Sequence, residues 1–99
     1  MATAQKPFIT VVAPCYNEEA ILELNINTIV NYLRSKAEKY NWEILIINDG
    51  SKDNTAAIAN RLSTQNSSIR VIHHPTNLNL GTAIKTGFAN AAEIGRAHV

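Results

Sequence analysis

Three short polar segments, each following an apolar run, carry the residues of this 99-residue sequence that could do chemistry. The first, Pro14-Cys15-Tyr16-Asn17-Glu18, combines an aromatic ring that could stack on a nucleobase with a carboxylate that could bind ribose hydroxyl groups. Taken alone, a plain turn before a helix capped by Asn17 explains this segment about equally well.

The second segment is Asn48-Asp49-Gly50-Ser51-Lys52-Asp53. A carboxylate such as that of Asp49 can accept a hydrogen bond from an N–H group of uracil or guanine. Gly50 permits backbone conformations that other residues resist. Ser51 or Asp53 is predicted to cap the helix that follows, and this capping role does not require a second acid at Asp49.

The third segment runs from Asn77 to Gly87 and includes Gly81 and Lys85. The first turn of a helix together with a lysine suits a diphosphate group, because both are electropositive. Taken alone, this segment is better explained by a solvated lysine and two glycines that allow close packing.

The residues between these segments predict three repeats of a strand followed by a helix. Apolar, β-branched runs predict strands over 8–13, 42–47 and 69–73, and three- and four-residue spacing predicts helices over 18–39, 54–65 and 81–92. This alternation indicates an α/β protein with a Rossmann-like parallel sheet. Ligands of such sheets bind at the carboxyl ends of the strands, so we expect the three polar segments to converge there.

Composition excludes several classes of protein. The net charge of +1 lacks the basic excess of a nucleic-acid-binding protein. A single cysteine, Cys15, excludes an internal disulfide framework and favours a reducing compartment. No apolar run reaches the roughly 18 residues of a membrane span. We therefore expect a cytoplasmic protein, or one at the cytoplasmic face of a membrane if a longer parent reaches it.

Other candidate sites receive structural interpretations. Cys15 has no histidine near it in the sequence and is interpreted as a packing residue. His73 and His74 are neighbours on a strand and should point to opposite faces, which argues against a shared metal ion. A dinucleotide-dependent oxidoreductase would need a glycine-rich turn after the first strand, where this chain has Glu18 instead.

Together the three segments resemble the family 2 glycosyltransferases. The motifs are Pro-x-Tyr-Asn-Glu-Glu from Pro14, Asn-Asp-Gly-Ser-x-Asp-x-Thr from Asn48, and Asn79-x-Gly81 with Gly87 further on. The resemblance covers about residues 8–92 and is closest in pattern to the polyprenyl-phosphate sugar transferases, which include enzymes similar to dolichyl-phosphate mannose synthase. It implies the nucleotide-binding half of a GT-A domain.

The resemblance also implies roles for individual residues. Pro14, Tyr16 and Glu18 would line the nucleoside pocket, Asp49 would bind the base, and Gly81 and Lys85 would lie near the diphosphate. Asn48 stands where many relatives have a second aspartate. The full set of expected nucleotide-sugar-binding residues is Pro14, Tyr16, Asn17, Glu18, Asp49, Gly50, Ser51, Gly81 and Lys85.

The Asp-x-Asp motif by which the family holds Mg²⁺ or Mn²⁺ does not occur in this sequence. We therefore expect no catalytic or metal-binding residue here, and assign both to a full-length parent. That parent would move a sugar from a UDP- or GDP-linked donor to polyprenyl phosphate or a glycan, with inversion. The chain itself should be inactive and bind nucleotides weakly at most. The alternative is a non-catalytic nucleotide-binding module of the same fold.

The sequence divides into a loose start (1–7), the partial GT-A domain (8–92) and a tail (93–99). The tail, Glu93-Ile-Gly-Arg-Ala-His-Val99, resembles one reading frame of a common sequencing adapter. We hypothesise that it is not native sequence, and native codons for these residues at the source locus would refute this. Any association with a membrane would then come from the missing part of the parent.

Overall fold

The computed structural model describes residues 6–91 and 97–98. Its elements alternate between strand and helix along the chain, which confirms the predicted α/β class. In order they are β1 (Phe8–Cys15), α1 (Leu22–Ser35), β2 (Asn41–Asn48), α2 (Thr55–Gln65), β3 (Ile69–His73), α3 (Leu80–Ala89) and β4 (Ala97–His98).

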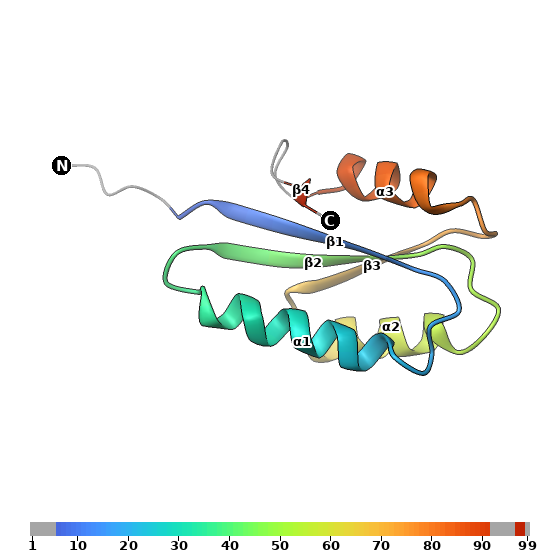
Figure 1. Cartoon of the computed structure of the whole chain (residues 1–99), viewed down its shortest axis with the longest axis horizontal. Coiled ribbons are helices and arrows are strands. Elements are labelled where there is room, and N and C mark those ends of the chain that lie inside the picture. Colours follow the sequence, from blue (N-terminus) through green and yellow to red (C-terminus); the bar gives the residue numbers. More distant parts are fainter. Residues whose placement is uncertain (1–5, 92–96, 99) are drawn as a thin grey trace.

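The strands form one parallel sheet in the order β3-β2-β1-β4. Helices α1 and α2 cover one face and α3 covers the other (Figure 1). The connections from β1 to β2 and from β2 to β3 each lead to the next strand on the same side. The connection from β3 to β4 leads back across β2 and β1 to the other edge of the sheet. Right-handed crossovers then require α3 to lie on the opposite face, as it does.

The two-residue strand β4 was not among the predicted elements, because it lies in the segment that we set aside as a non-native tail. Ala97 and His98 pair with Thr10 and Val11 along the outer edge of β1. That edge offers backbone groups that β2 does not use, so a returning chain can pair with it. Residues 92–96 and 99 lie outside the described residues, and the proposed boundary of the tail stays a prediction.

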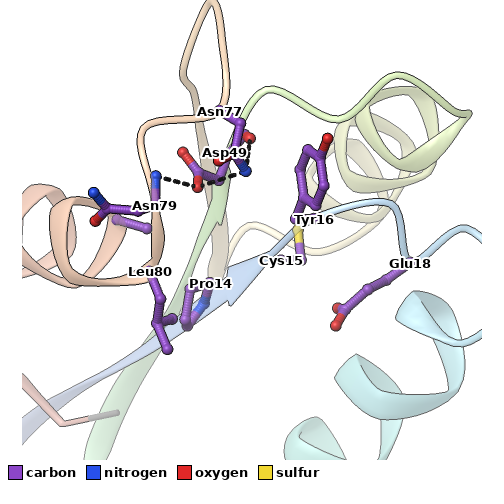
Figure 2. A pocket seen from close by; sticks show the side chains of 9 residues that line it. Pro14, Cys15, Tyr16, Glu18, Asp49, Asn77, Asn79 and Leu80 are labelled. Atoms are coloured by element: carbon purple, nitrogen blue, oxygen red, sulfur yellow. Dashed lines mark hydrogen bonds between the residues drawn. The ribbon is translucent and has the colours of Figure 1, made fainter.

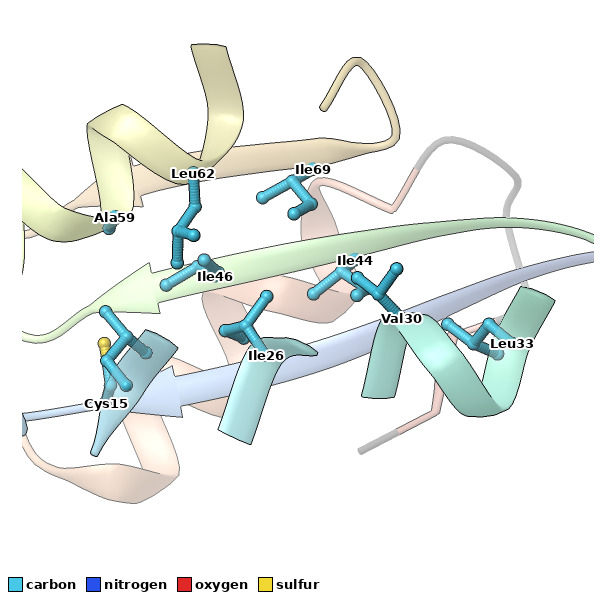
Figure 3. Packing of buried hydrophobic residues seen from close by; sticks show 10 residues of the cluster. Cys15, Ile26, Val30, Leu33, Ile44, Ile46, Ala59, Leu62 and Ile69 are labelled. Atoms are coloured by element: carbon cyan, nitrogen blue, oxygen red, sulfur yellow. The ribbon is translucent and has the colours of Figure 1, made fainter. Parts of the chain in front are cut away.

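The larger part of the core lies between the sheet and the helices α1 and α2 (Figure 3). Ile44 and Ile46 of β2 are fully buried on this face, whereas Leu45 and Ile47 are fully buried on the other. Burial on both faces is why the strand sequence is continuously apolar and does not alternate. The first core cluster consists of Cys15, Leu22, Ile26, Val30, Leu33, Ile44, Ile46, Ala59, Leu62 and Ile69.

Helix α3 packs on the opposite face, where Ala83 contacts Val12, Leu45 and Ile47. Gly87 allows this helix to approach β1 closely, since a β-carbon at that position would overlap the side chain of Val12. The first turn of α3 is thereby held beside the carboxyl ends of the strands.

Every predicted element except β3 has at least one boundary that differs from the structure, by one to four residues, and two of these boundaries lie beside the strand ends where a ligand is expected. Strand β1 does not end at residue 13, before Pro14, but continues to Cys15, whose carbonyl accepts the backbone N–H of Asp49 at the β2 side. Pro14 therefore faces away from β2, and its missing N–H breaks no hydrogen bond between β1 and β2. Helix α1 starts at Leu22 and not at residue 18, because residues 18–21 form a separate turn in which the N–H of Ile21 donates to the carbonyl of Glu18.

Candidate functional site

A cavity of about 330 Å³ opens at the carboxyl ends of the strands (Figure 2). This volume lies at the lower end of the range typical of small-molecule sites. The cavity borders β1, and the sheet order reverses between β1 and the edge strand β4; such reversal points are where open α/β sheets bind ligands. Its lining residues are Pro14, Cys15, Tyr16, Glu18, Asp49, Asn77, Asn79, Leu80 and Ala83.

The loops after β1 and β2 are fastened to each other beside this cavity. The backbone N–H of Asn17 donates to Ser51 Oγ at 2.9 Å, and Asn17 Oδ1 accepts from the N–H of Lys52 at 2.8 Å. One residue further, the N–H of Glu18 donates to Thr55 Oγ1 at 2.8 Å. Asn17 and Ser51 thus hold the two loops in place, and neither lines the cavity.

The capping roles predicted for these loops are confirmed only in part. Asn17 does not cap α1, which begins after Ile21 without a side-chain cap. Ser51 does not cap α2, because its hydroxyl accepts from Asn17 instead. Asp53 does satisfy a first-turn donor of α2, since its Oδ1 accepts from the N–H of Thr55 at 2.9 Å.

The loops after β2 and β3 also touch, at Gly50. This residue has a φ of 70°, and a β-carbon there would overlap the backbone of Thr76. Only glycine fits such a position without displacing the neighbouring loop. Gly50 thus allows the loops after β2 and β3 to pack closely against each other.

The Asp49 carboxylate is buried in the wall of the cavity and surrounded by donors. Its Oδ1 accepts from His74 Nδ1 at 2.7 Å and from the N–H of Leu78 at 2.9 Å. Its Oδ2 accepts from the N–H of Asn79 at 3.0 Å and from Asn77 Nδ2 at 3.1 Å (Figure 2). Burial opposes ionisation, but these hydrogen bonds, led by that from His74, hold the pKa of Asp49 below its usual value.

Asn79 has an unusual backbone conformation at the rim of the cavity. Its φ of 87° and ψ of 165° fall in a region that is occupied almost only by glycine. Its side-chain Oδ1 accepts from the N–H of Thr82 at 2.9 Å and so caps α3. The strain therefore persists because both the backbone and the side chain of Asn79 are held.

Burial and neighbouring negative charges raise the pKa values of both Glu18 and Cys15. The Glu18 side chain accepts no hydrogen bond within the described part of the chain, and burial, then the charge of Asp53, raises its pKa. Burial, then the charges of Glu18, Asp53 and Asp49, raises the pKa of the Cys15 thiol to about 12. A neutral, buried thiol is no nucleophile, which agrees with the packing role expected of Cys15.

Tyr16 and Leu80 provide exposed apolar surface at the mouth of the cavity, with 40% and 62% of each residue accessible. In Figure 2 Leu80 lies next to Pro14, and the ring of Tyr16 stands on the far side of Cys15. This arrangement leaves a partly apolar space between a loop and the start of α3.

Four of the nine expected binding residues line the cavity, namely Pro14, Tyr16, Glu18 and Asp49. Gly81 and Lys85 are exposed on α3 and are not among its lining residues. Sequence reasoning did not assign the other five lining residues to the site, although all of them stand in the segments that it singled out: Cys15, Asn77, Asn79, Leu80 and Ala83. Their position directly after a strand was the available signal.

The two histidines point apart, as predicted from their neighbouring positions on a strand. His73 interacts with Asn48 Nδ2 and Asn60 Oδ1, at 3.0 and 2.8 Å. His74 interacts with Asp49 and, through Nε2, with Thr86 Oγ1 at 2.9 Å. The two imidazole rings therefore contact helices on opposite faces of the sheet, α2 and α3.

The described residues do not by themselves supply a set of metal ligands. Among residues 6–91 and 97–98, no three histidine, cysteine, aspartate or glutamate side chains lie close enough together to hold an ion. The Asp49 oxygens, the best buried acceptors in the cavity, are already occupied by four donors. The described residues alone therefore do not fit a divalent metal ion.

None of the described helices combines the length and the apolar character needed to cross a membrane.

Comparison with known proteins supports the family resemblance. The family model of glycosyl transferase family 2 matches residues 10–93. A dolichyl-phosphate beta-glucosyltransferase of Trichomonas vaginalis is 37% identical over 83 residues, which are 81% of this chain and 26% of that protein. The enzyme of the same name from Saccharomyces cerevisiae is 33% identical over 88 residues, 82% of this chain and 25% of that protein.

Among solved structures, a mannosyltransferase from Pyrobaculum calidifontis in complex with GDP-Man and Mn²⁺ has the same fold. It matches with a TM-score of 0.72 and 22% identity, over 89% of this chain and 25% of that one. The chain thus spans about a quarter of the length of the relatives it matches. Since the family model covers most of its residues, the chain belongs to glycosyl transferase family 2.

Proposed function

We propose that this chain is the donor-nucleotide-binding part of a glycosyltransferase. The full protein would move a sugar from a nucleotide-diphosphate sugar to a polyprenyl phosphate such as dolichyl phosphate, at the cytoplasmic face of a membrane. The observation that carries the proposal is the cavity between Tyr16, Glu18 and Asn79, at the point where the sheet order reverses. Family membership supports the reaction class, and the names of the relatives suggest the acceptor.

The cavity matches the parts of a nucleoside. The exposed ring of Tyr16 can stack on the base, and the unpaired carboxylate of Glu18 can accept hydrogen bonds from ribose hydroxyl groups. The side chains of Pro14 and Leu80 add apolar contact. The first turn of α3 is electropositive and favours the diphosphate, with Lys85 further along the same helix.

Binding and chemistry would be divided between this chain and the rest of the parent. Mg²⁺ or Mn²⁺ would neutralise the leaving diphosphate there. The residues of this chain would orient the nucleoside and hold the wall around it. The neutral thiol of Cys15 and the fully occupied carboxylate of Asp49 leave neither group free for a chemical step.

Nuclear magnetic resonance titration of the ¹⁵N-labelled chain with UDP, GDP, UDP-glucose and GDP-mannose tests the nucleotide site. We expect shift changes confined to Tyr16, Glu18 and the residues from Asn77 to Leu80, with a dissociation constant in the millimolar range. Tyr16→Ala should abolish them. Tyr32→Ala is the matched control, because Tyr32 is an exposed tyrosine on α1 away from this cavity. Changes spread over α1, or none at 10-fold excess over about 1 mM protein, would contradict the proposal.

A sugar-transfer assay tests whether binding lies in this chain and chemistry in the rest of the parent protein. A longer protein that continues past residue 92 should carry an Asp-x-Asp motif after a fourth strand and should glycosylate dolichyl phosphate. The 99-residue chain should transfer no sugar from the same donors. Transfer by the short chain would show that the catalytic group lies within it.

A further inference from the structure

His74 connects two elements behind the cavity without lining it. It follows β3 directly, and its side chain is 8% exposed. Its Nδ1 lies 2.7 Å from Asp49 Oδ1, and its Nε2 lies 2.9 Å from Thr86 Oγ1 on α3. The imidazole ring therefore bridges the end of β2 and the middle of α3.

Both hydrogen bonds of His74 persist in either protonation state of the ring. An ionised carboxylate only accepts, so Nδ1 carries the proton that faces Asp49. In the neutral ring Nε2 accepts from the hydroxyl of Thr86, and in the charged ring it donates to the same oxygen, because a threonine hydroxyl can do both. The orientation of the ring is thus fixed from two sides.

The Asp49 carboxylate carries this restraint to the wall of the cavity. It accepts from the backbone N–H groups of Leu78 and Asn79 and from the side chain of Asn77. With His74 these are four donors, the number that the two oxygens can accept. A rotation of the carboxylate would break the bonds to the loop as well as the bond to His74.

The loop held in this way is strained. Asn79 occupies a backbone region that a residue with a β-carbon adopts only when its surroundings impose it. Asn77, Asn79 and Leu80 line the cavity from this loop, so the strained backbone forms the wall.

We infer that His74 is a positioning residue for the nucleotide cavity. It fixes the Asp49 carboxylate, which in turn holds residues 77–79 in the strained conformation that shapes the wall. That the cavity binds a nucleotide rests on the function proposed above. The link from His74 through Asp49 to the loop is supported by the hydrogen bonds alone.

Two polar substitutions of His74 test its two hydrogen bonds one at a time. Asparagine places an amide donor close to the position of Nδ1, so His74→Asn should keep the bond to Asp49. Glutamine places its amide close to the position of Nε2, so His74→Gln should keep the contact with Thr86 and lose the bond to Asp49. His73→Gln is the matched control, since His73 contacts Asn48 and Asn60.

The first readout is hydrogen exchange of the Leu78 and Asn79 amides in the full 99-residue chain, with Ile46 of β2 as the internal reference. We expect about tenfold faster exchange of both amides in His74→Gln, as for loss of one charge-assisted hydrogen bond, and little change at Ile46. His74→Asn and His73→Gln should stay close to the unsubstituted chain. If His74→Asn and His74→Gln speed exchange of the loop amides equally, and Ile46 also exchanges faster, His74 contributes only to overall stability and the inference is overturned. Unchanged exchange of the loop amides in His74→Gln would also overturn it.

The second readout is the nucleotide titration of the same variants. His74→Gln should weaken UDP or GDP binding about tenfold, whereas His74→Asn should bind as tightly as the unsubstituted chain. If the loop amides respond as expected but no nucleotide binds the unsubstituted chain, the positioning role is supported and the proposed function is refuted. If a nucleotide binds and the loop amides do not respond, the proposed function is supported and the role of His74 is refuted.

Discussion

The two carboxylates of the cavity are shifted in opposite directions. Burial raises the pKa of Glu18, and the charge of Asp53 adds to this. Burial acts in the same direction on Asp49, but the hydrogen bonds from His74, Leu78 and Asn79 outweigh it and lower its pKa. The fold is therefore stabilised by the ionised form of Asp49 and destabilised by that of Glu18. Glu18 has no side-chain hydrogen-bond partner among the described residues, and a carboxyl group with a perturbed pKa in a cavity is typical of a binding residue.

Glu18→Gln should raise the midpoint of thermal unfolding at pH 7. Because the folded state raises the pKa of Glu18, its contribution to stability is present below the unfolded value of about 4.3 and lost as the pH rises through the folded value. Glutamine stays neutral, so the advantage of the variant should grow from pH 4 to pH 7.

Glu23→Gln is the control of opposite sign, measured by the same thermal unfolding series. Its hydrogen bond and ion pair with Arg61 lower the pKa of Glu23, so this variant should lose stability as the pH rises. Two variants that change in the same direction would contradict the assignment of Glu18 as an unpaired acid.

At the scale of single residues, the sequence predicted which groups stand at the strand ends but not how they are used. Tyr16 and Glu18 line the cavity as expected. Asp49 also lines the cavity, with four internal donors around its carboxylate, and its binding of a base stays a prediction. A sequence shows that a carboxylate is present, but its donors come from residues 25 to 30 positions away, and this pairing depends on the fold.

At the scale of elements, the interiors of the strands and helices were predictable and their ends were not. The strand Ile69–His73 has the predicted bounds, and α2 differs by one residue at its start. The first helix is shorter at both ends than its apolar spacing indicated. The residues before its start, 18–21, form a turn that is held to α2 by the hydrogen bond from the N–H of Glu18 to Thr55 Oγ1, and local patterns carry no sign of such a contact.

Two glycines of α3 should respond differently to the same substitution. Gly87→Ala should lower the free energy of unfolding by about 2–3 kcal/mol, because the added methyl group overlaps Val12 in a packed core. Gly81→Ala should leave it unchanged or raise it by up to about 1 kcal/mol, since alanine favours helices. The nearest atom to its new β-carbon is Asn79 Oδ1 at 3.4 Å. Urea unfolding measures both, and equal effects would contradict the close contact between α3 and β1.

The loop before α3 stores strain that glycine should relieve. Asn79→Ala should cost about 2 kcal/mol or more, because alanine keeps the unfavourable φ of 87° and loses the cap on Thr82. Asn79→Gly loses the same cap but fits the backbone, so we expect it to lie within about 1 kcal/mol of the unsubstituted chain. Urea unfolding of the pair isolates the backbone contribution. An alanine variant as stable as the glycine variant would show that Asn79 is unstrained.

At the scale of the whole molecule, a buried polar network joins the sheet to α3 at the end opposite the cavity. Glu43 of β2 accepts from Thr10 Oγ1 at 2.7 Å and from Arg70 Nε at 2.7 Å. Arg70 also donates to the carbonyl of Asn90 at 2.6 Å, just after α3. Three strands and the end of a helix are thus connected through one carboxylate with 7% side-chain exposure. The sequence showed only a glutamate at the start of an apolar strand.

This network makes the two arginine–glutamate pairs of the described chain unequal. Arg70→Ala should lower the free energy of unfolding by about 3 kcal/mol, because it removes the cation from a buried carboxylate. Arg61→Ala breaks a pair in which both side chains are more than two-fifths exposed, so the loss should stay below about 1 kcal/mol. Salt distinguishes them further, since 0.5 M NaCl should erase the Arg61 effect and leave most of the Arg70 effect. Urea unfolding of both variants with and without salt measures this. Equal, salt-sensitive losses would mean that the Glu43 network is solvated and does not tie α3 to the sheet, in which case the position of α3 would rest on the packing of Ala83 and Gly87 and on the contact between Thr86 and His74.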